Sequence, residues 1–88
     1  MAKLQIYVAP HCAGSERARL LAEQMQTLFP ALAIEVIDLA RQTAPPDFLI
    51  GTPTFALDGR VLSLGNPPEA VLARRIEDAL SMEGMKHR

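Results

Sequence analysis

The sequence predicts an α/β domain with a mixed four-stranded sheet and helices on both of its faces. Three observations lead to this fold class. The first 40 residues follow the order strand, helix, strand, which is the βαβ unit that joins two parallel strands. Residues 54–64 show two apolar runs joined by Asp58-Gly59, a strong hairpin signal. A proline-rich helix start at 66–69 then opens a final helix, so the predicted order is β-α-β, a short helix or loop, β-β-α.

The βαβ unit is defined by a change of period along the chain. Residues 3–9 alternate apolar and polar side chains, as a strand does. From Ser15 to Phe29 the apolar positions take helical spacing, and Pro30 ends that helix. Residues 33–39 are rich in β-branched side chains and predict the second strand. The predicted buried stripe of the helix consists of Ala18, Leu21, Ala22, Met25, Leu28 and Phe29.

The second half begins with a less regular stretch, residues 40–51. Pro45-Pro46-Asp47 predicts one or two helical turns there, because proline suits the first turn of a helix. Asn66 or a neighbour is expected to cap the last helix, with the two following prolines in its first turn. The buried stripe of that helix is predicted to be Val71, Leu72, Ile76, Ala79 and Leu80. Gly84 is expected past the helix end, so the domain spans residues 1–81 and residues 82–88 form a frayed tail.

Composition narrows the classes of function. The net charge is −1, which gives no electrostatic basis for binding nucleic acid or an anionic membrane. No apolar run is long enough to span a bilayer, and the N-terminus lacks the pattern of a signal peptide, so we expect a cytoplasmic protein. The chain has a single cysteine and two histidines far apart in sequence, so we expect no disulfide within the chain and no metal site. Any redox chemistry must therefore take its second sulfur from a protein partner or a small thiol.

Cys12 lies between the first predicted strand and the first helix. The positive end of a helix dipole and the free N–H groups of its first turn stabilise a thiolate, so we predict that the pKa of Cys12 is lowered. His11 adjoins the thiol, and Ser15 is placed to donate its hydroxyl to the sulfur. Simpler interpretations stay open: Cys12 as an inert half-buried residue, His11 as a solvated loop residue, and Ser15 as a helix N-cap.

Three motifs, taken in their order along the chain, resemble the thioredoxin superfamily, and the resemblance covers nearly the whole chain. Cys12-Ala13-Gly14-Ser15 stands where that family keeps Cys-x-x-Cys or Cys-x-x-Ser, Thr52-Pro53 stands where it keeps a cis-proline, and the hairpin leads through Gly65 into the last helix. The resemblance implies a thioredoxin-like sandwich in which Pro53 faces the Cys12 sulfur. It also implies that His11, Thr52 and Pro53 contact the substrate, with Thr52 offering its backbone N–H and C=O to an extended peptide or to glutathione.

Ser15 stands where the family has its resolving cysteine, which implies a monothiol protein. Cys12 would form a mixed disulfide that only an external thiol releases. Glutathione is a candidate co-substrate, but Pro67 and Pro68 lack the N–H groups that would bind its far carboxylate at the last helix. The motif also departs from the Cys-Gly-Phe-Ser that supports an iron–sulfur cluster, so no cofactor is expected.

A second, partial resemblance leaves another function open. Residues 7–9, 34–39 and 52–54 are similar to KaiB-type proteins, which use a thioredoxin-like half for interaction. Two hypotheses follow: a monothiol thiol–disulfide oxidoreductase acting through Cys12, or a non-catalytic binding module that uses the same groove or the hairpin edge. An uncovered hairpin edge would also allow two copies to pair as a homodimer.

Overall fold

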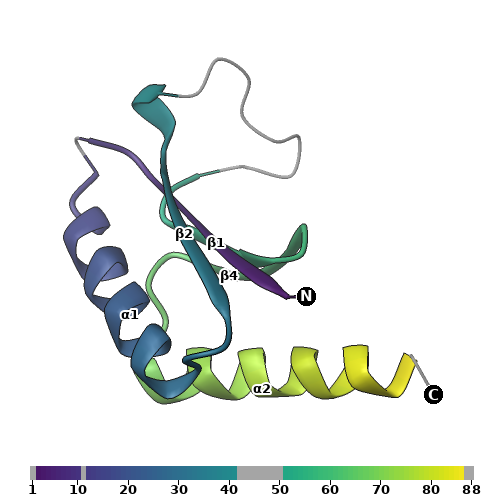
Figure 1. Ribbon diagram of the computed structural model, residues 1–88. Helices are drawn as coiled ribbons and strands as arrows, with labels where there is room; N and C mark the ends of the chain where they lie inside the picture. The colour runs from purple at the N-terminus through teal and green to yellow at the C-terminus, as the bar shows by residue number, and fades with distance from the viewer. Residues whose placement is uncertain (1, 11, 42–50, 87–88) are drawn as a thin grey trace.

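The computed structural model describes residues 2–10, 12–41 and 51–86, and Figure 1 shows how the elements are arranged. These residues form four strands, two α-helices and one short 3-10 helix in the predicted order. These are β1 (Lys3–Val8), α1 (Ser15–Leu28), β2 (Ala33–Asp38), η1 (Leu39–Arg41), β3 (Thr54–Leu57), β4 (Arg60–Leu64) and α2 (Glu69–Lys86). The helical turns predicted from Pro45-Pro46-Asp47 lie outside the described residues.

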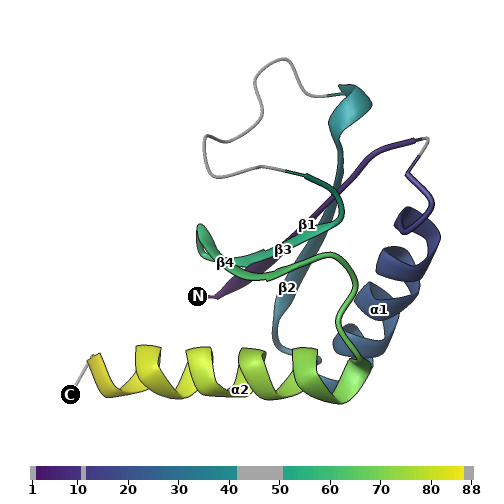
Figure 2. The same cartoon turned by 180° about the vertical axis from the view of Figure 1, so that it is seen from behind.

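The four strands form one mixed sheet in the order β2-β1-β3-β4. β1 and β2 are parallel and are connected through α1, as the βαβ prediction requires. β3 runs antiparallel to both β1 and β4, so β1 and β3 are central and β2 and β4 are edges. Figure 2 shows the same sheet from behind, with β3 and β4 next to one another. The mixed four-stranded sheet predicted from the sequence is confirmed.

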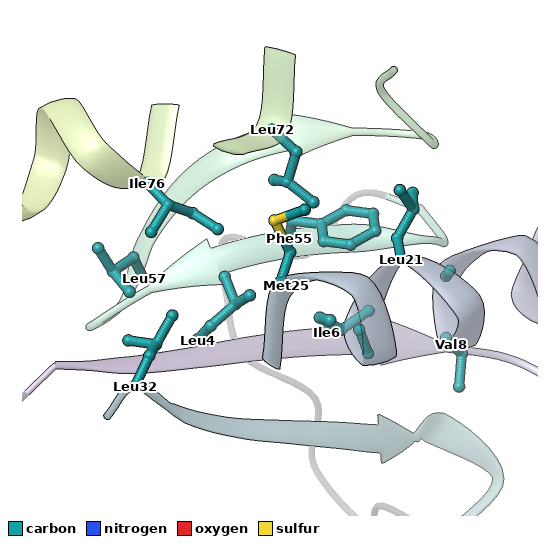
Figure 3. Packing of buried hydrophobic residues seen from close by; sticks show 12 residues of the cluster. Leu4, Ile6, Val8, Leu21, Met25, Leu32, Phe55, Leu57, Leu72 and Ile76 are labelled. Carbon is teal, nitrogen blue, oxygen red and sulfur yellow. The ribbon is translucent and has the colours of Figure 1, made fainter. Parts of the chain in front are cut away.

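The hydrophobic core lies on one face of this sheet. Because side chains alternate along a strand, Leu4, Ile6 and Val8 of β1 point to the same side, where Phe55 and Leu57 of β3 join them. Figure 3 shows that both helices cover this side: α1 contributes Leu21 and Met25, and α2 contributes Leu72 and Ile76. The sequence predicts helices on both faces, and both α-helices in the described residues lie on this one.

The hairpin between β3 and β4 has the predicted two-residue turn. Asp58 and Gly59 both have positive φ, 50° and 84°, as a type I′ turn requires. Asp58 also ties the turn to β1: its carboxylate accepts the Lys3 N–H at 2.9 Å, and its own N–H donates to the Lys3 carbonyl at 3.0 Å. The turn therefore holds the hairpin in register with the first strand.

Several predictions about the buried sides and ends of the helices are wrong. Leu28 is 52% exposed, because α1 ends there and Phe29 turns its own ring onto the core instead. Val71 is 39% exposed, because Leu72 and Ile76, four residues apart, already form the buried side of α2. Gly84 lies within α2, which continues to Lys86, so the glycine does not end the helix. No helix in the described part of the chain is long and apolar enough to cross a membrane.

Candidate thiol site

Cys12 lies in the tight turn that connects β1 to α1. The Cys12 N–H donates to the Ala9 carbonyl at 3.2 Å, and the Ser15 N–H donates to the Cys12 carbonyl at 3.1 Å. These two bonds fold the chain back on itself directly before the first residue of α1. The Cys12 side chain is half-buried, and its thiol is free. The turn therefore presents the sulfur at the N-terminal end of α1, as predicted.

The segment Thr52–Pro53 approaches this thiol from a distant part of the sequence. The Thr52–Pro53 peptide bond is cis, and the Cys12 Sγ–H donates to the Thr52 carbonyl at 3.4 Å. Pro53 is buried, and its carbonyl accepts the Gly65 N–H at 2.8 Å. The structure therefore brings together three of the predicted site residues, Cys12, Thr52 and Pro53. Another predicted site residue, His11, lies outside the described residues.

The surroundings of Cys12 lower the pKa of its thiol. The largest effect comes from the Thr52 hydroxyl, which stabilises the thiolate as a hydrogen-bond donor, and the Gly14 N–H adds to it. Partial burial acts in the opposite direction, and the Ser15 hydroxyl and N–H make smaller favourable contributions. Thr52 thus offers two groups: its carbonyl accepts from the neutral thiol, and its hydroxyl favours the charged form.

Ser15 is not the helix N-cap that the sequence predicts. Gly14 occupies the N-cap position of α1, without any side-chain capping bond. The buried Ser15 hydroxyl instead donates to the Ala9 carbonyl at 2.8 Å and accepts the Ala9 N–H at 3.2 Å. A hydroxyl carries one proton, and here the proton is engaged by Ala9. We therefore assign most of the thiolate stabilisation to Thr52 and Gly14 rather than to Ser15.

Asn66 belongs to the same region, although the sequence predicts it only as a helix cap. Its Nδ2–H donates to the Gly14 carbonyl at 2.8 Å, two residues after Cys12 along the chain. The two prolines after it also stand before α2 rather than in its first turn, since the helix begins at Glu69. An asparagine before two prolines is a common helix start, so the sequence holds no signal for this contact with Gly14.

A shallow pocket of about 360 Å³ opens beside the cis-proline. It is lined by Gly51, Thr52, Pro53, Leu64 and Gly65. Leu64, the last residue of β4, is 55% exposed and supplies an apolar wall. Among the described residues no three potential metal ligands lie together. The site therefore combines an accessible thiol, backbone polar groups and a small apolar surface.

Several solved structures have a similar arrangement of elements. A selenoprotein W-related protein from Vibrio cholerae superposes with a TM-score of 0.67 at 19% identity, over 89% of this chain and 95% of that one. A mutant thioredoxin from Halobacterium salinarum gives 0.65 at 25% identity, over 88% and 73% of the two chains. The periplasmic thioredoxin SoxS from Paracoccus pantotrophus gives 0.63 at 23% identity, over 90% and 99%.

These likenesses establish the class of protein: the chain has the thioredoxin-like fold. Within that class, this chain carries a single thiol at the start of α1, next to a cis-proline. No protein-family model matches the sequence, and no curated protein sequence matches it. None of the three structures above is a KaiB-type protein, so the partial resemblance to that family stays a prediction.

Proposed function

We propose that the protein takes part in thiol–disulfide exchange as a monothiol protein, with Cys12 as the nucleophile. The observation that carries the proposal is the position of the Cys12 sulfur, 3.4 Å from the carbonyl that precedes the cis-proline. A thiol with a lowered pKa is more often in the nucleophilic thiolate form near neutral pH. The relatives in fold include thioredoxins, which favours a redox role for this site.

The reaction begins with attack of the Cys12 thiolate on one sulfur of a partner disulfide. A new bond forms between Cys12 Sγ and that sulfur, and the second sulfur leaves as a thiolate that takes up a proton. Cys12 is the only cysteine, so no internal thiol can attack the mixed disulfide. An external thiol must attack the partner's sulfur, which regenerates the Cys12 thiolate and leaves the partner joined to the external thiol.

A protein is the partner that the site suits best. The exposed backbone beside Thr52 and the apolar wall at Leu64 favour an extended peptide with an apolar side chain next to its cysteine. Glutathione is less suited, because Pro67 and Pro68 offer no N–H group before α2, and Glu69 adds negative charge at the helix start. The cytoplasm, where thiols stay reduced, suits a protein with one free cysteine.

The alternative function is a non-catalytic binding module. Two observations favour it: the chain has no resolving sulfur, and the edge strand β4 exposes the apolar side chains of Val61 and Leu64. An exposed apolar edge can pair with a strand of a partner or of a second copy. In this alternative the Cys12 thiol would contribute shape but no covalent chemistry.

The experiment that separates the two functions is mixed-disulfide formation followed by intact-mass analysis. The protein is incubated with oxidised glutathione and, in parallel, with a peptide that carries an activated disulfide beside a leucine. We expect a rapid adduct on Cys12 that reduced thiol removes, and a faster reaction with the peptide than with glutathione. Cys12→Ser is the control and must form no adduct. If neither disulfide forms an adduct with the wild-type protein, exchange through Cys12 is refuted.

A further inference from the structure

Asn66 binds the loop that carries the thiol, and its neighbour Gly65 binds the cis-proline. Its Nδ2–H bonds the Gly14 carbonyl at 2.8 Å across 52 positions of the sequence. A Cβ atom on Gly14 would lie 2.9 Å from Asn66 Nδ2 and 3.2 Å from Pro53 Cδ, so Gly14 packs closely against both residues. The neighbouring Gly65 N–H holds the Pro53 carbonyl at 2.8 Å. Gly65 therefore binds the Pro53 segment and Asn66 binds the Gly14 segment, and these two segments form the thiol site.

The group that Asn66 holds is directly linked to the donors around the sulfur. The Gly14 carbonyl and the Ser15 N–H belong to one peptide plane, so fixing the carbonyl also fixes that N–H. The N–H groups of Gly14 and Ser15 both stabilise the Cys12 thiolate. The Gly14 carbonyl accepts a second bond from the Ala18 N–H at 3.0 Å, which uses both of its lone pairs. Rotation of this carbonyl would therefore turn the Ser15 N–H, the smaller of the two backbone donors, with it.

The Asn66 side chain is not optimised for stability alone. Its Oδ1 is buried and has no hydrogen-bond partner among the described residues. A buried acceptor without a donor is unfavourable, and most proteins avoid it. An asparagine that capped α2 would have satisfied that oxygen. A half-satisfied amide with a buried oxygen beside the thiol loop therefore points to a role in the site.

We infer that Asn66 is a positioning residue for exchange at Cys12, because its amide orients the Gly14–Ser15 peptide and holds the thiol loop against Pro53. The inference rests on the proposed function, in that the positioned group is the nucleophile. This role differs from a purely structural role of Asn66 in its effect on the thiol. Loss of the amide should change the ionisation of the Cys12 thiol, and not only the stability of the fold.

The test compares variants by the pH dependence of Cys12 alkylation with iodoacetamide. Asn66→Leu removes the donor at nearly the same size, and Asn66→Asp keeps the shape but places an acceptor against the Gly14 carbonyl. We expect the inflection to move to higher pH in both, and alkylation near neutral pH to slow by about threefold. Asn66→Asp is measured in high salt, which screens its added charge.

Gln26→Leu is the matched control. The Gln26 amide donates to the Leu32 carbonyl at 2.9 Å and the Phe29 carbonyl at 3.3 Å, at the opposite end of α1 from the thiol. This variant should lose stability without moving the inflection. The inference is overturned if the Asn66 variants keep the wild-type inflection, or if Gln26→Leu shifts it equally.

A measurement on the unaltered protein covers the case in which the Asn66 variants do not fold. The side-chain amide NMR resonances of Asn66 should titrate with the Cys12 inflection, and those of Gln26 should not. Constant Asn66 resonances through that titration would contradict the inference. If the proposed function fails instead, the wild-type protein forms no mixed disulfide, but the alkylation inflection still shifts in the Asn66 variants.

Discussion

The Thr52 hydroxyl is the side-chain group that most lowers the pKa of the Cys12 thiol. Thr52→Val removes this donor while keeping a β-branched shape, so the pKa of Cys12 should rise. We expect the wild-type alkylation rate to inflect below about pH 8.5, the value of a free thiol. The inflection in Thr52→Val should lie higher, with alkylation near neutral pH roughly threefold slower. Thr27→Val, which loses an exposed hydroxyl bond to the Glu23 carbonyl within α1, should behave like wild type.

Gly14 is required for its lack of a side chain rather than for its backbone angles. Its φ is −83°, which any residue adopts, but a Cβ would lie 2.9 Å from Asn66 Nδ2. Gly14→Ala should destabilise the fold by about 1–3 kcal/mol in urea unfolding, as overpacked sites do. Replacing Asn66 by alanine in the same chain makes room for the new Cβ. The double variant should therefore lose less stability than the sum of the two single variants, and simple additivity would contradict this account.

At the scale of elements, α1 divides sharply into a buried and an exposed side. Leu21 is fully buried between the helix and the sheet, whereas Leu28, two turns later, is 52% exposed. Leu21→Ala should cost about 2–5 kcal/mol, because it leaves a cavity in the core. Leu28→Ala should change the free energy of unfolding by no more than about 0.5 kcal/mol. Equal losses in the two variants would show that the helix packs differently.

The β3–β4 hairpin depends on the left-handed backbone of its turn. Gly59 has a φ of 84° and open space around its Cβ position, so a side chain there would meet strain but no clash. Gly59→Ala should therefore destabilise the protein by about 1–2 kcal/mol, measured by thermal or urea unfolding. Gly51→Ala is the control: it also has open space but no positive φ, so its stability should stay level or rise by up to about 1 kcal/mol.

At the scale of the whole molecule, one core cluster unites β1, α1, β3 and α2. A single shared core predicts cooperative, two-state unfolding. Tyr7 is buried in β1 and is the only tyrosine in a chain without tryptophan, so its fluorescence reports on the sheet. Far-UV circular dichroism reports mainly on the two helices. The two urea curves should coincide, whereas an earlier loss of helix signal would mean that α2 unfolds separately.

The fold was predictable because its signals are local. The alternation in β1, the period of α1 and the Asp58-Gly59 turn each depend on residues near one another in sequence. The end of α2 was not predictable, because an interior Gly84 continues the helix instead of ending it. Leu28 was placed on the wrong side, because the sequence does not show that α1 ends there and that Phe29 packs on the core instead.

The site was predictable only in part, for a related reason. Cys12 and Pro53 could be paired through the resemblance to a known family, and the structure brings the thiol to the carbonyl preceding this proline. The bond between Asn66 and Gly14 joins residues 52 positions apart and follows no repeating pattern. Ser15 was assigned a cap, because the sequence could not show that the Ala9 carbonyl would take its proton.

The hydrogen bonds to the Cys12 sulfur should make its alkylation rate depend on whether the chain is folded. Thr52 and Gly14, the main donors, are separated in sequence by α1, β2 and η1 and meet only in the native structure. In a denatured chain the sulfur loses both and regains the acidity of an ordinary cysteine. Most protein thiols are labelled faster when the protein unfolds, because burial had protected them. Near neutral pH this one should be labelled more slowly, so brief alkylation would mark the native molecules in a mixed population.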